Sequence, residues 1–123
     1  MQFSEDKQTQ PFVFHRVEEH SVLVNDTRYD HSIIITVEPA LLPWAITSIE
    51  QLTAELLAPL MQGHPDLIIV GTGTKPAPLP QQLIALCWEK RIGLEAMTTP
   101  AAARTYNVLA NEGRKVAIAI VIS

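Results

Sequence analysis

The most informative segment of the chain is Asp66-Leu-Ile-Ile-Val-Gly-Thr-Gly-Thr-Lys75, in which an apolar run stops at two glycines and a lysine. Consecutive branched apolar residues are typical of a central strand that is covered on both faces. Glycines just past the carboxyl end of such a strand lie where open α/β sheets bind their ligands. The segment therefore predicts a buried strand over residues 67–70 that leads into a loop at a binding crevice.

The length and composition indicate one domain. A chain of 123 residues can bury about two thirds of its unfolded surface without disulfides or metals. Cys87 is the only cysteine, which excludes an intramolecular disulfide and fits a reducing compartment. Residues 1–10 are polar and do not resemble a signal peptide, so we expect a flexible tail before a single domain of residues 11–123. The longest apolar runs fall far short of the ~20 residues of a membrane-spanning helix. We therefore expect a cytoplasmic protein without direct membrane insertion.

The charge is unevenly distributed along the chain. Residues 1–66 carry three Lys or Arg and ten Asp or Glu, a formal charge of −7, whereas residues 67–123 carry six and three, a formal charge of +3. The half with the excess of cations contains the glycine segment, which is compatible with a local anion site. The overall formal charge of −4 comes without the basic stripe that binding to a phosphate backbone requires, so no nucleic-acid partner is expected.

The first third of the chain predicts antiparallel sheet. Residues 11–17 and 21–24 are rich in β-branched and aromatic residues and favour a hairpin. A turn at residues 25–28 leads to a third strand over residues 29–37, which Pro39 ends because proline removes a ladder donor.

The middle of the chain predicts an extended segment followed by a helix. Trp44 lies in an apolar segment interrupted by a proline, and we expect a stretch that lays the indole ring against the core. A helix is expected over residues 48–61, with several Ser and Thr residues competing for its N-cap. Pro59 should kink or end this helix.

A helix is also expected after the glycine segment. Residues 76–80 are too rich in proline for regular structure, but Pro80 suits the first position of a helix that runs to about Arg91. Gly93 is placed to close this helix in a left-handed cap. The residues of its predicted apolar stripe are Leu83, Ile84, Cys87 and Trp88.

The last third continues the alternation of strands and helices. A strand over residues 94–98 precedes Thr99 as N-cap and Pro100 as first residue of an Ala-rich helix that Gly113 ends. The final run, residues 116–122, has the alternation of a central strand. Because no repeat or low-complexity linker divides the chain, the sequence predicts one α/β domain.

Two interpretations of the glycine segment remain open. The third glycine of a dinucleotide-binding fingerprint would fall at Pro76, and Lys75 lacks the preceding glycine spacing of a P-loop. The segment is then either a tight turn that clears the sheet or a concave loop whose backbone N–H groups bind an anion. The residues of this candidate anion loop are Gly71, Thr72, Gly73, Thr74 and Lys75.

The last helix supplies further candidates. Arg104, Asn107 and Asn111 share one polar face of this helix. Either the face is simply solvated, or Arg104 on this face lines the glycine loop. Tyr106 could bury its ring and present its hydroxyl, so Arg104, Tyr106 and Asn107 complete the candidate site. The residues expected to face inward are Thr105, Val108 and Leu109.

The sequence predicts no metal, no cofactor and no conventional hydrolase chemistry. The four histidines lack the spacing of metal ligands. No serine lies in a nucleophile elbow, and Cys87, in an apolar helix stripe, lacks the exposed electropositive setting of a reactive thiolate. Glu95 and Glu112 are the carboxylates nearest to the candidate site in sequence, and neither is placed as an evident general base.

Five segments carry a resemblance to a known family, namely Leu67-Ile-Ile-Val-Gly-Thr-Gly-Thr-Lys75, Leu79-Pro80, Gly93-Leu-Glu95, Arg104-Thr-Tyr-Asn-Val-Leu109 and Glu112-Gly-Arg114. The chain resembles the Mth-domain family over essentially its whole length. The resemblance implies a three-layer α/β fold with flanking helices and an extra N-terminal β layer. It also implies a mixed central sheet of about five strands, a common sheet size, whose last strand runs antiparallel to the others.

The family includes the mitochondrial respiratory complex I assembly factor 3, an adipogenesis-associated mammalian protein and many bacterial members without assigned activity. This sequence has Thr98 where many members carry Asp, and Ala103 where many carry Cys. Both differences remove reactive groups. The resemblance therefore implies a non-enzymatic interaction or assembly role with an unknown protein partner, such as a subunit of a membrane complex.

The alternative function is that of an enzyme or sensor for a small anionic metabolite, with Lys75 and Arg104 as charge partners. The sequence also leaves homodimer formation open, through an exposed strand edge or the region around Trp44.

Overall fold

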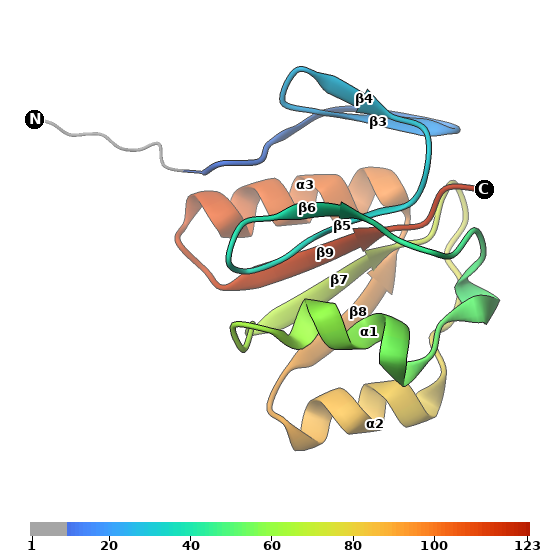
Figure 1. Cartoon of the computed structure of the whole chain (residues 1–123), viewed down its shortest axis with the longest axis vertical. Helices are drawn as coiled ribbons and strands as arrows, with labels where there is room; N and C mark the ends of the chain where they lie inside the picture. Colours follow the sequence, from blue (N-terminus) through green and yellow to red (C-terminus); the bar gives the residue numbers. More distant parts are fainter. Residues whose placement is uncertain (1–9) are drawn as a thin grey trace, which may run out of the picture.

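The computed structural model describes residues 10–123, so the tail expected at residues 1–10 lies outside the described residues except for Gln10. The described chain forms one α/β domain with two sheets (Figure 1). The small sheet has the order β2 (Phe14–Glu18), β3 (Ser21–Val24) and β4 (Thr27–Tyr29). The large sheet has the order β6 (Leu41–Pro43), β5 (Ile33–Ile35), β9 (Val116–Ile120), β7 (Leu67–Gly71) and β8 (Gly93–Met97). The helices are η1 (Ile49–Gln51), α1 (Ala54–Met61), α2 (Gln81–Glu89) and α3 (Thr99–Asn111).

The large sheet is mixed, but the last strand is not its antiparallel member. β9 pairs parallel with β7, and β7 pairs parallel with β8. β5 is the strand that runs antiparallel to β9. The direction implied by the family resemblance is therefore wrong. The physical reason is that α3 joins β8 to β9 as a helical crossover, a connection that returns the chain in the same direction.

The predicted central strand is confirmed. β7 lies between β8 and β9, and Ile68, Ile69 and Val70 are fully buried. Ile69 faces the cluster that includes α3 and the small sheet, whereas Ile68 and Val70 face the cluster that includes α1 and α2. Both faces of the strand are thus covered, as its unbroken apolar run predicts.

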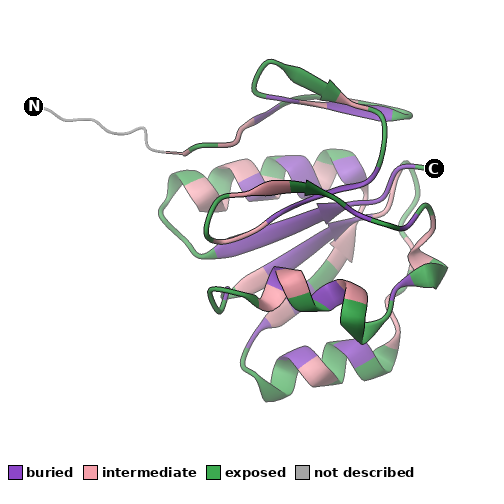
Figure 2. Ribbon diagram, in the orientation of Figure 1, coloured by how far each residue is buried: buried purple, intermediate pink, exposed green. Residues whose placement is uncertain are grey.

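The layers follow from these two faces. Figure 1 shows the small sheet at the top, α3 beneath it, and α1 and α2 below the large sheet. Figure 2 shows that β7 and β9 are buried between these layers. The extra N-terminal β layer is therefore present, and it packs against α3 through β2.

The strand predicted over residues 29–37 is divided into β4 and β5. The break lies at Ser32, where the chain leaves the small sheet and enters the large one. Ser32 is buried, and its Oγ accepts a hydrogen bond from Ile122 N at 2.8 Å and donates to Ile122 O at 3.3 Å. A side chain that replaces ladder bonds in this way lets the backbone change sheets without leaving polar groups unpaired.

The helix predicted over residues 48–61 is two helices, because two of the competing N-caps are used. Ser48 caps η1 in a capping box with Gln51, and Thr53 caps α1 by accepting from Leu56 N at 3.2 Å. Pro59 lies inside α1, which ends two residues later. Trp44 is buried as predicted, and its Nε1–H donates to Leu56 O at 3.0 Å.

The predicted stripe of α2 is only half correct. Leu83 and Cys87 are buried, but Ile84 is 39% exposed and Trp88 is 76% exposed. α2 packs on the edge strand β8, so only a narrow face of the helix meets the sheet. The left-handed residue after α2 is Arg91, with φ of 62°, and Gly93 instead begins β8.

α3 begins one residue earlier than expected. Thr98 occupies the N-cap without a side-chain hydrogen bond, so the cap predicted at Thr99 is wrong. Gly113, with φ of 82°, follows the end of the helix as predicted. Val108 is 55% exposed rather than inward-facing, because it lies two positions from the buried Tyr106 and therefore on the other side of the helix.

Candidate functional site

The glycine loop follows β7 and is tied to the neighbouring strands. Val121 N donates to Gly71 O at 2.9 Å, and Thr72 N donates to Met97 O at 2.9 Å. Thr72 Oγ1 donates to Lys75 O at 2.7 Å, which closes the turn from within. These bonds hold the loop at the carboxyl ends of the parallel strands, as the sequence predicts.

The amino end of α3 approaches the loop closely. Gly73 N donates to Thr99 Oγ1 at 2.8 Å, and Thr99 N donates to Gly73 O at 2.9 Å. A Cβ at Gly71 would lie 2.9 Å from Ile120 Cδ1 and 3.2 Å from Ala102 Cβ. Glycine at position 71 therefore permits the close approach of helix and strand, and glycine at position 73 adopts φ of 96°.

Only some of the backbone N–H groups of the glycine loop are available to an anion. The N–H groups of Thr72 and Gly73 are already used within the protein. Among residues 10–123, the N–H groups of Thr74 and Lys75 donate to no other residue. An anion at this loop would therefore bind to the second half of the turn.

Two hollows meet at the glycine loop. The first, which we name the hairpin cavity, has a volume of about 230 Å³ and lies between the β2–β3 hairpin and the start of α3. Its walls include Val17, Glu18, Val22, Thr74, Thr99 and Val121. The second, which we name the loop cleft, has a volume of about 460 Å³. Its walls include Glu19, Thr47, Glu50, Thr74, Lys75 and Ala77.

The charges differ between the two hollows. Lys75 lines the loop cleft together with Glu19 and Glu50. The charged residues that line the hairpin cavity are Glu18 and Glu19. The described residues thus give the hairpin cavity a negative rim and the loop cleft a mixed one.

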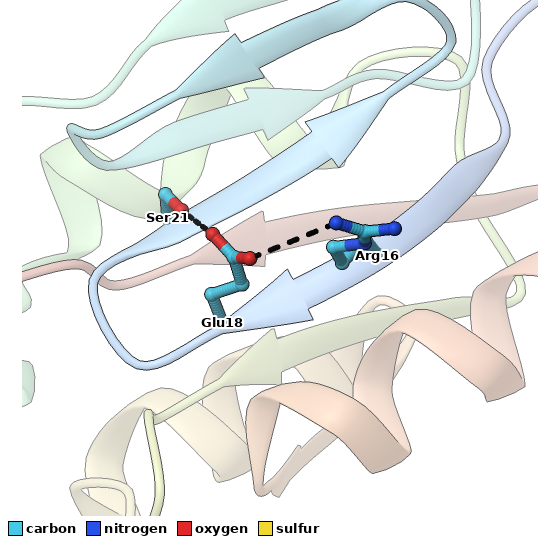
Figure 3. A network of polar contacts seen from close by, with 3 residues as sticks. All are labelled: Arg16, Glu18 and Ser21. Carbon is cyan, nitrogen blue, oxygen red and sulfur yellow. Dashed lines mark hydrogen bonds and ion pairs between the residues drawn. The ribbon is translucent and has the colours of Figure 1, made fainter.

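The carboxylate of Glu18 is held in place by two neighbours (Figure 3). Ser21 is buried, and its Oγ donates to Glu18 Oε1 at 3.1 Å. Arg16 Nη1 lies 3.9 Å from Glu18 Oε2, with both side chains more than half exposed. An exposed pair at this distance contributes little to stability. Glu18 lines the cavity with its full formal charge, which Arg16 offsets in part from outside the lining.

The structure does not bring the three candidates on α3 to the loop. Arg104 is exposed and lines a separate hollow of about 250 Å³ with Phe14, Arg16 and Asn107. Asn107 accepts from Phe14 N at 3.0 Å and donates to Phe14 O at 2.8 Å, so it fastens β2 to the helix. The five loop residues lie together as predicted, whereas anion binding by any of the eight stays a prediction.

Tyr106 is buried rather than presented to a ligand. Its ring meets Phe14 edge-on with centroids 5.6 Å apart, and only 4% of the residue is exposed. Burial raises the pKa of its hydroxyl to about 12, because the charged form is poorly solvated there. Together with Asn107, Tyr106 makes α3 an attachment surface for the small sheet.

Two groups that line the hairpin cavity carry no signal in the sequence. Glu18 and Ser21 lie in a segment that looks like an ordinary hairpin, and only its docking over α3 turns them toward the glycine loop. The sequence predicts a different role for Thr99, because Thr before Pro is typical of an N-cap.

The residues that the structure describes contain no group of three or more His, Cys, Asp or Glu arranged to hold a metal ion. Burial raises the pKa of the Cys87 thiol, and the nearby Lys90 opposes this rise only in part. The thiol is therefore mostly protonated at neutral pH and a poor nucleophile. Within residues 10–123, the helices are too short or too polar to cross a bilayer.

Residues 14–121 match the family model described as a protein of unknown function, DUF498/DUF598. The chain belongs to this family. Two solved structures share the fold of this chain, as the resemblance to the Mth-domain family implies. A crystal structure from Bordetella parapertussis is 30% identical, with a TM-score of 0.86 and coverage of 95% of this chain and 100% of that one. A solution structure from Bordetella pertussis, titled a Mth938-like domain, is 27% identical, with a TM-score of 0.81 and coverage of 99% and 92%.

Two curated relatives of this chain bear names that concern membranes or assembly. The 13 kDa major membrane protein of Francisella tularensis subsp. holarctica is 26% identical over 98% of this chain and 99% of that protein. The NADH dehydrogenase (ubiquinone) 1 alpha subcomplex assembly factor 3 of Rattus norvegicus is 32% identical over 67% of this chain and 48% of that protein. The match thus spans about half the length of the assembly factor.

Proposed function

We propose that this protein is a non-enzymatic interaction protein that assists the assembly of a protein complex. The observation that carries the proposal is the outer surface of α2, where Trp88 is 76% exposed and Ile84 is 39% exposed. The two residues are four positions apart and therefore neighbours on one helical face. Large exposed apolar groups rimmed by polar residues mark interaction surfaces.

The surroundings of Trp88 have the composition of a protein interface. A hollow of about 580 Å³ lies beside the ring, with Asp66, Glu89 and Arg91 among its walls. An aromatic anchor inside a polar rim is the arrangement in which few residues supply most of the binding free energy. The adjacent strand β8 is an edge of the large sheet and adds unpaired backbone groups for an extended partner segment.

The name of one relative also supports an assembly role. The rat relative is named as an assembly factor of NADH dehydrogenase. We extend this to a partner that is a protein subunit of a membrane-associated complex. The helix α2 would then bind that subunit while it is still outside its finished complex.

The test is affinity capture from native cells after gentle cross-linking, with three versions of the protein. The wild type is compared with the double variant Ile84→Ser/Trp88→Ala and with Val108→Ser, which alters an exposed apolar residue on α3. We expect the wild type and Val108→Ser to recover the same subunits of one membrane complex, and the double variant to lose them. Equal recovery by all three proteins would remove α2 from the interaction. Light scattering would show whether the captured partner is instead a second copy of this chain.

A second candidate is binding of a small anion at the loop cleft, as a sensor or an enzyme would require. It is favoured by the open N–H groups of Thr74 and Lys75 and by the Lys75 ammonium group. The carboxylates of Glu19 and Glu50 on the same cleft weigh against it. For this reason it ranks second.

The anion candidate is tested by thermal unfolding in inorganic phosphate and sulfate at constant ionic strength. If the loop cleft binds the anion, the wild type gains stability, Lys75→Gln loses this gain and Arg104→Gln keeps it, because Arg104 lines another hollow. Both variants should melt near the wild-type temperature without anion, since exposed charges contribute about 1 kcal/mol or less. A loss only in Arg104→Gln would move the site to the hollow beside β2.

A further inference from the structure

We propose that the hairpin cavity is a binding site for a small organic cation, a molecule with an apolar body, one positively charged amine and one hydroxyl or carbonyl oxygen. The cavity lies between Val17 to Val22 of the β2–β3 hairpin on one side and Gly73, Thr74 and Thr99 on the other. This site is separate from the α2 surface and does not depend on a protein partner.

The size and walls of the hairpin cavity suit a small organic body. Its volume of about 230 Å³ exceeds the roughly 150 Å³ of an engineered protein cavity that holds benzene. The apolar side of the wall is formed by Val17, Val22, Pro100, Val121 and Ile122. A ring or branched alkyl group against these residues removes apolar surface from water, which favours binding.

The polar anchor inside the cavity is Thr99. The residue is only 5% exposed, and its Oγ1 already accepts the hydrogen bond from Gly73 N at 2.8 Å. A threonine hydroxyl also has one hydrogen to donate. Among residues 10–123 no acceptor takes this hydrogen, and both Thr99 and its partner Gly73 line the cavity. A buried donor without an acceptor is unfavourable, so a ligand oxygen at this point would be stabilised.

The charges at the mouth select the sign of the ligand. Glu18 and Glu19 line the cavity, and none of its described lining residues is Lys or Arg. Ser21 fixes one oxygen of Glu18 from inside the hairpin, while Arg16 touches the other oxygen only at 3.9 Å (Figure 3). Glu19 lies 3.7 Å from the His20 ring. Two carboxylates at one mouth attract an ammonium group and repel a carboxylate or phosphate.

The geometry therefore assigns three contacts to the ligand. Its apolar body fills the space against the valines, its oxygen accepts from Thr99 Oγ1, and its ammonium group lies at Glu18 and Glu19. The loop cleft, whose rim also carries Lys75, lacks this uniform negative charge, although the two hollows share Glu19, Gly73, Thr74 and Val121.

The test uses three probes with the same phenyl body and one hydroxyl each, namely 2-phenylglycinol, 2-phenylethanol and mandelate. Amide chemical shifts of the full chain are followed by NMR during titration with each probe. We expect 2-phenylglycinol to shift the amides of Val22, Gly73 and Thr99 and to bind about tenfold more tightly than mandelate, since attraction to the carboxylates becomes repulsion. The uncharged 2-phenylethanol should lie between the two.

Single substitutions measure how much each of the three contacts contributes to probe binding. Glu18→Gln should weaken 2-phenylglycinol several-fold without changing 2-phenylethanol, whereas Glu112→Gln, an exposed carboxylate change beyond the cavity, should change neither. Thr99→Val should weaken both probes, and Thr99→Ser, which keeps the hydroxyl, should restore them. If Thr99→Val does not fold, the probe series and Glu18→Gln still decide the outcome.

Four results would overturn the assignment. Three of them are binding of mandelate as tight as that of 2-phenylglycinol, shifts that map outside the hairpin cavity, and no saturable shifts with any of the three probes. Equal binding of 2-phenylglycinol and 2-phenylethanol would show that the cavity is an apolar pocket that does not select a cation.

Discussion

α3 and α2 flank opposite faces of the same sheet, but only α3 is covered on its outer side. Ala102, Ala103 and Tyr106 of α3 are buried between the large sheet and the small one. α2 buries Leu83 and Cys87 and leaves Trp88 in solvent. Both helices have apolar residues at helical spacing, so the difference lies in what surrounds them.

A helix between two layers becomes part of the core, whereas a helix at the end of a stack keeps a free face. The small sheet supplies the second layer for α3, whereas α2 is the lowest element in Figure 1 and leaves Trp88 76% exposed among the described residues. The α3 side should therefore respond to substitution through stability, and the outer face of α2 should respond through binding.

The largest difference is expected between the two tryptophans. Trp44→Ala removes a buried ring and its hydrogen bond to Leu56 O, and should lower the free energy of unfolding by about 3–5 kcal/mol. Trp88→Ala makes the same chemical change at an exposed position and should cost about 0.5 kcal/mol or less. Urea unfolding followed by far-UV circular dichroism measures both. Similar costs would show that Trp88 is covered in solution, and the comparison of the helices would fail.

The next largest effect concerns the attachment of the small sheet to α3. Asn107→Ala leaves both Phe14 N and Phe14 O without their partner and should cost about 1–3 kcal/mol. Asn111→Ala, on the exposed end of the same helix, should stay within about 0.5 kcal/mol of the wild type. Amide hydrogen exchange at Phe14 should speed up only in Asn107→Ala. Unchanged exchange there would mean that the small sheet is held by apolar packing alone.

A smaller effect is expected where α3 meets the glycine loop. Thr99→Ala removes the acceptor of Gly73 N and should cost about 1 kcal/mol. Thr98→Ala should cost only a few tenths of a kcal/mol, because the Thr98 side chain makes no cap hydrogen bond. Thermal unfolding of both variants distinguishes them. The opposite order would mean that the Thr98 side chain caps α3 and that the bond between Gly73 N and Thr99 Oγ1 contributes little.

The smallest effect at neutral pH is expected from the hydroxyl of Tyr106. Its folded-state pKa of about 12 lies above the pKa of 10.0 that is ordinary for a tyrosine hydroxyl. The folded protein thus holds this proton while the unfolded chain releases it. The resulting contribution to stability is fully present below about pH 10 and is lost as the pH rises toward about 12. Tyr106→Phe should remove this alkaline loss, so the stability difference from wild type should be constant below pH 9 and should shift in favour of the variant above pH 10. Urea midpoints at several pH values test this, and a constant difference throughout would show that the hydroxyl reaches water.

The sequence predicts the position of the glycine loop, but it does not predict which residues of α3 lie beside that loop. The sequence predicts the glycine loop because an apolar run followed by glycines is a local signal of a strand end. Helical spacing places Arg104 on a polar face of α3, but spacing does not specify which end of α3 meets the loop. The structure places Arg104 beside Phe14 and Arg16 of the small sheet instead.

The chain's local patterns were sufficient for the single α/β domain, the buried strand β7, the buried Trp44 and the loop after β7. Each of these follows from hydrophobic periodicity or from the backbone chemistry of glycine and proline, which act over a few residues. Tertiary structure decided the parallel direction of β9, the exposure of Trp88 and the enclosure of the hairpin cavity over Thr99. These features depend on which distant segments pack together, and a residue's burial is set by its neighbours in space rather than by its place in a periodic pattern.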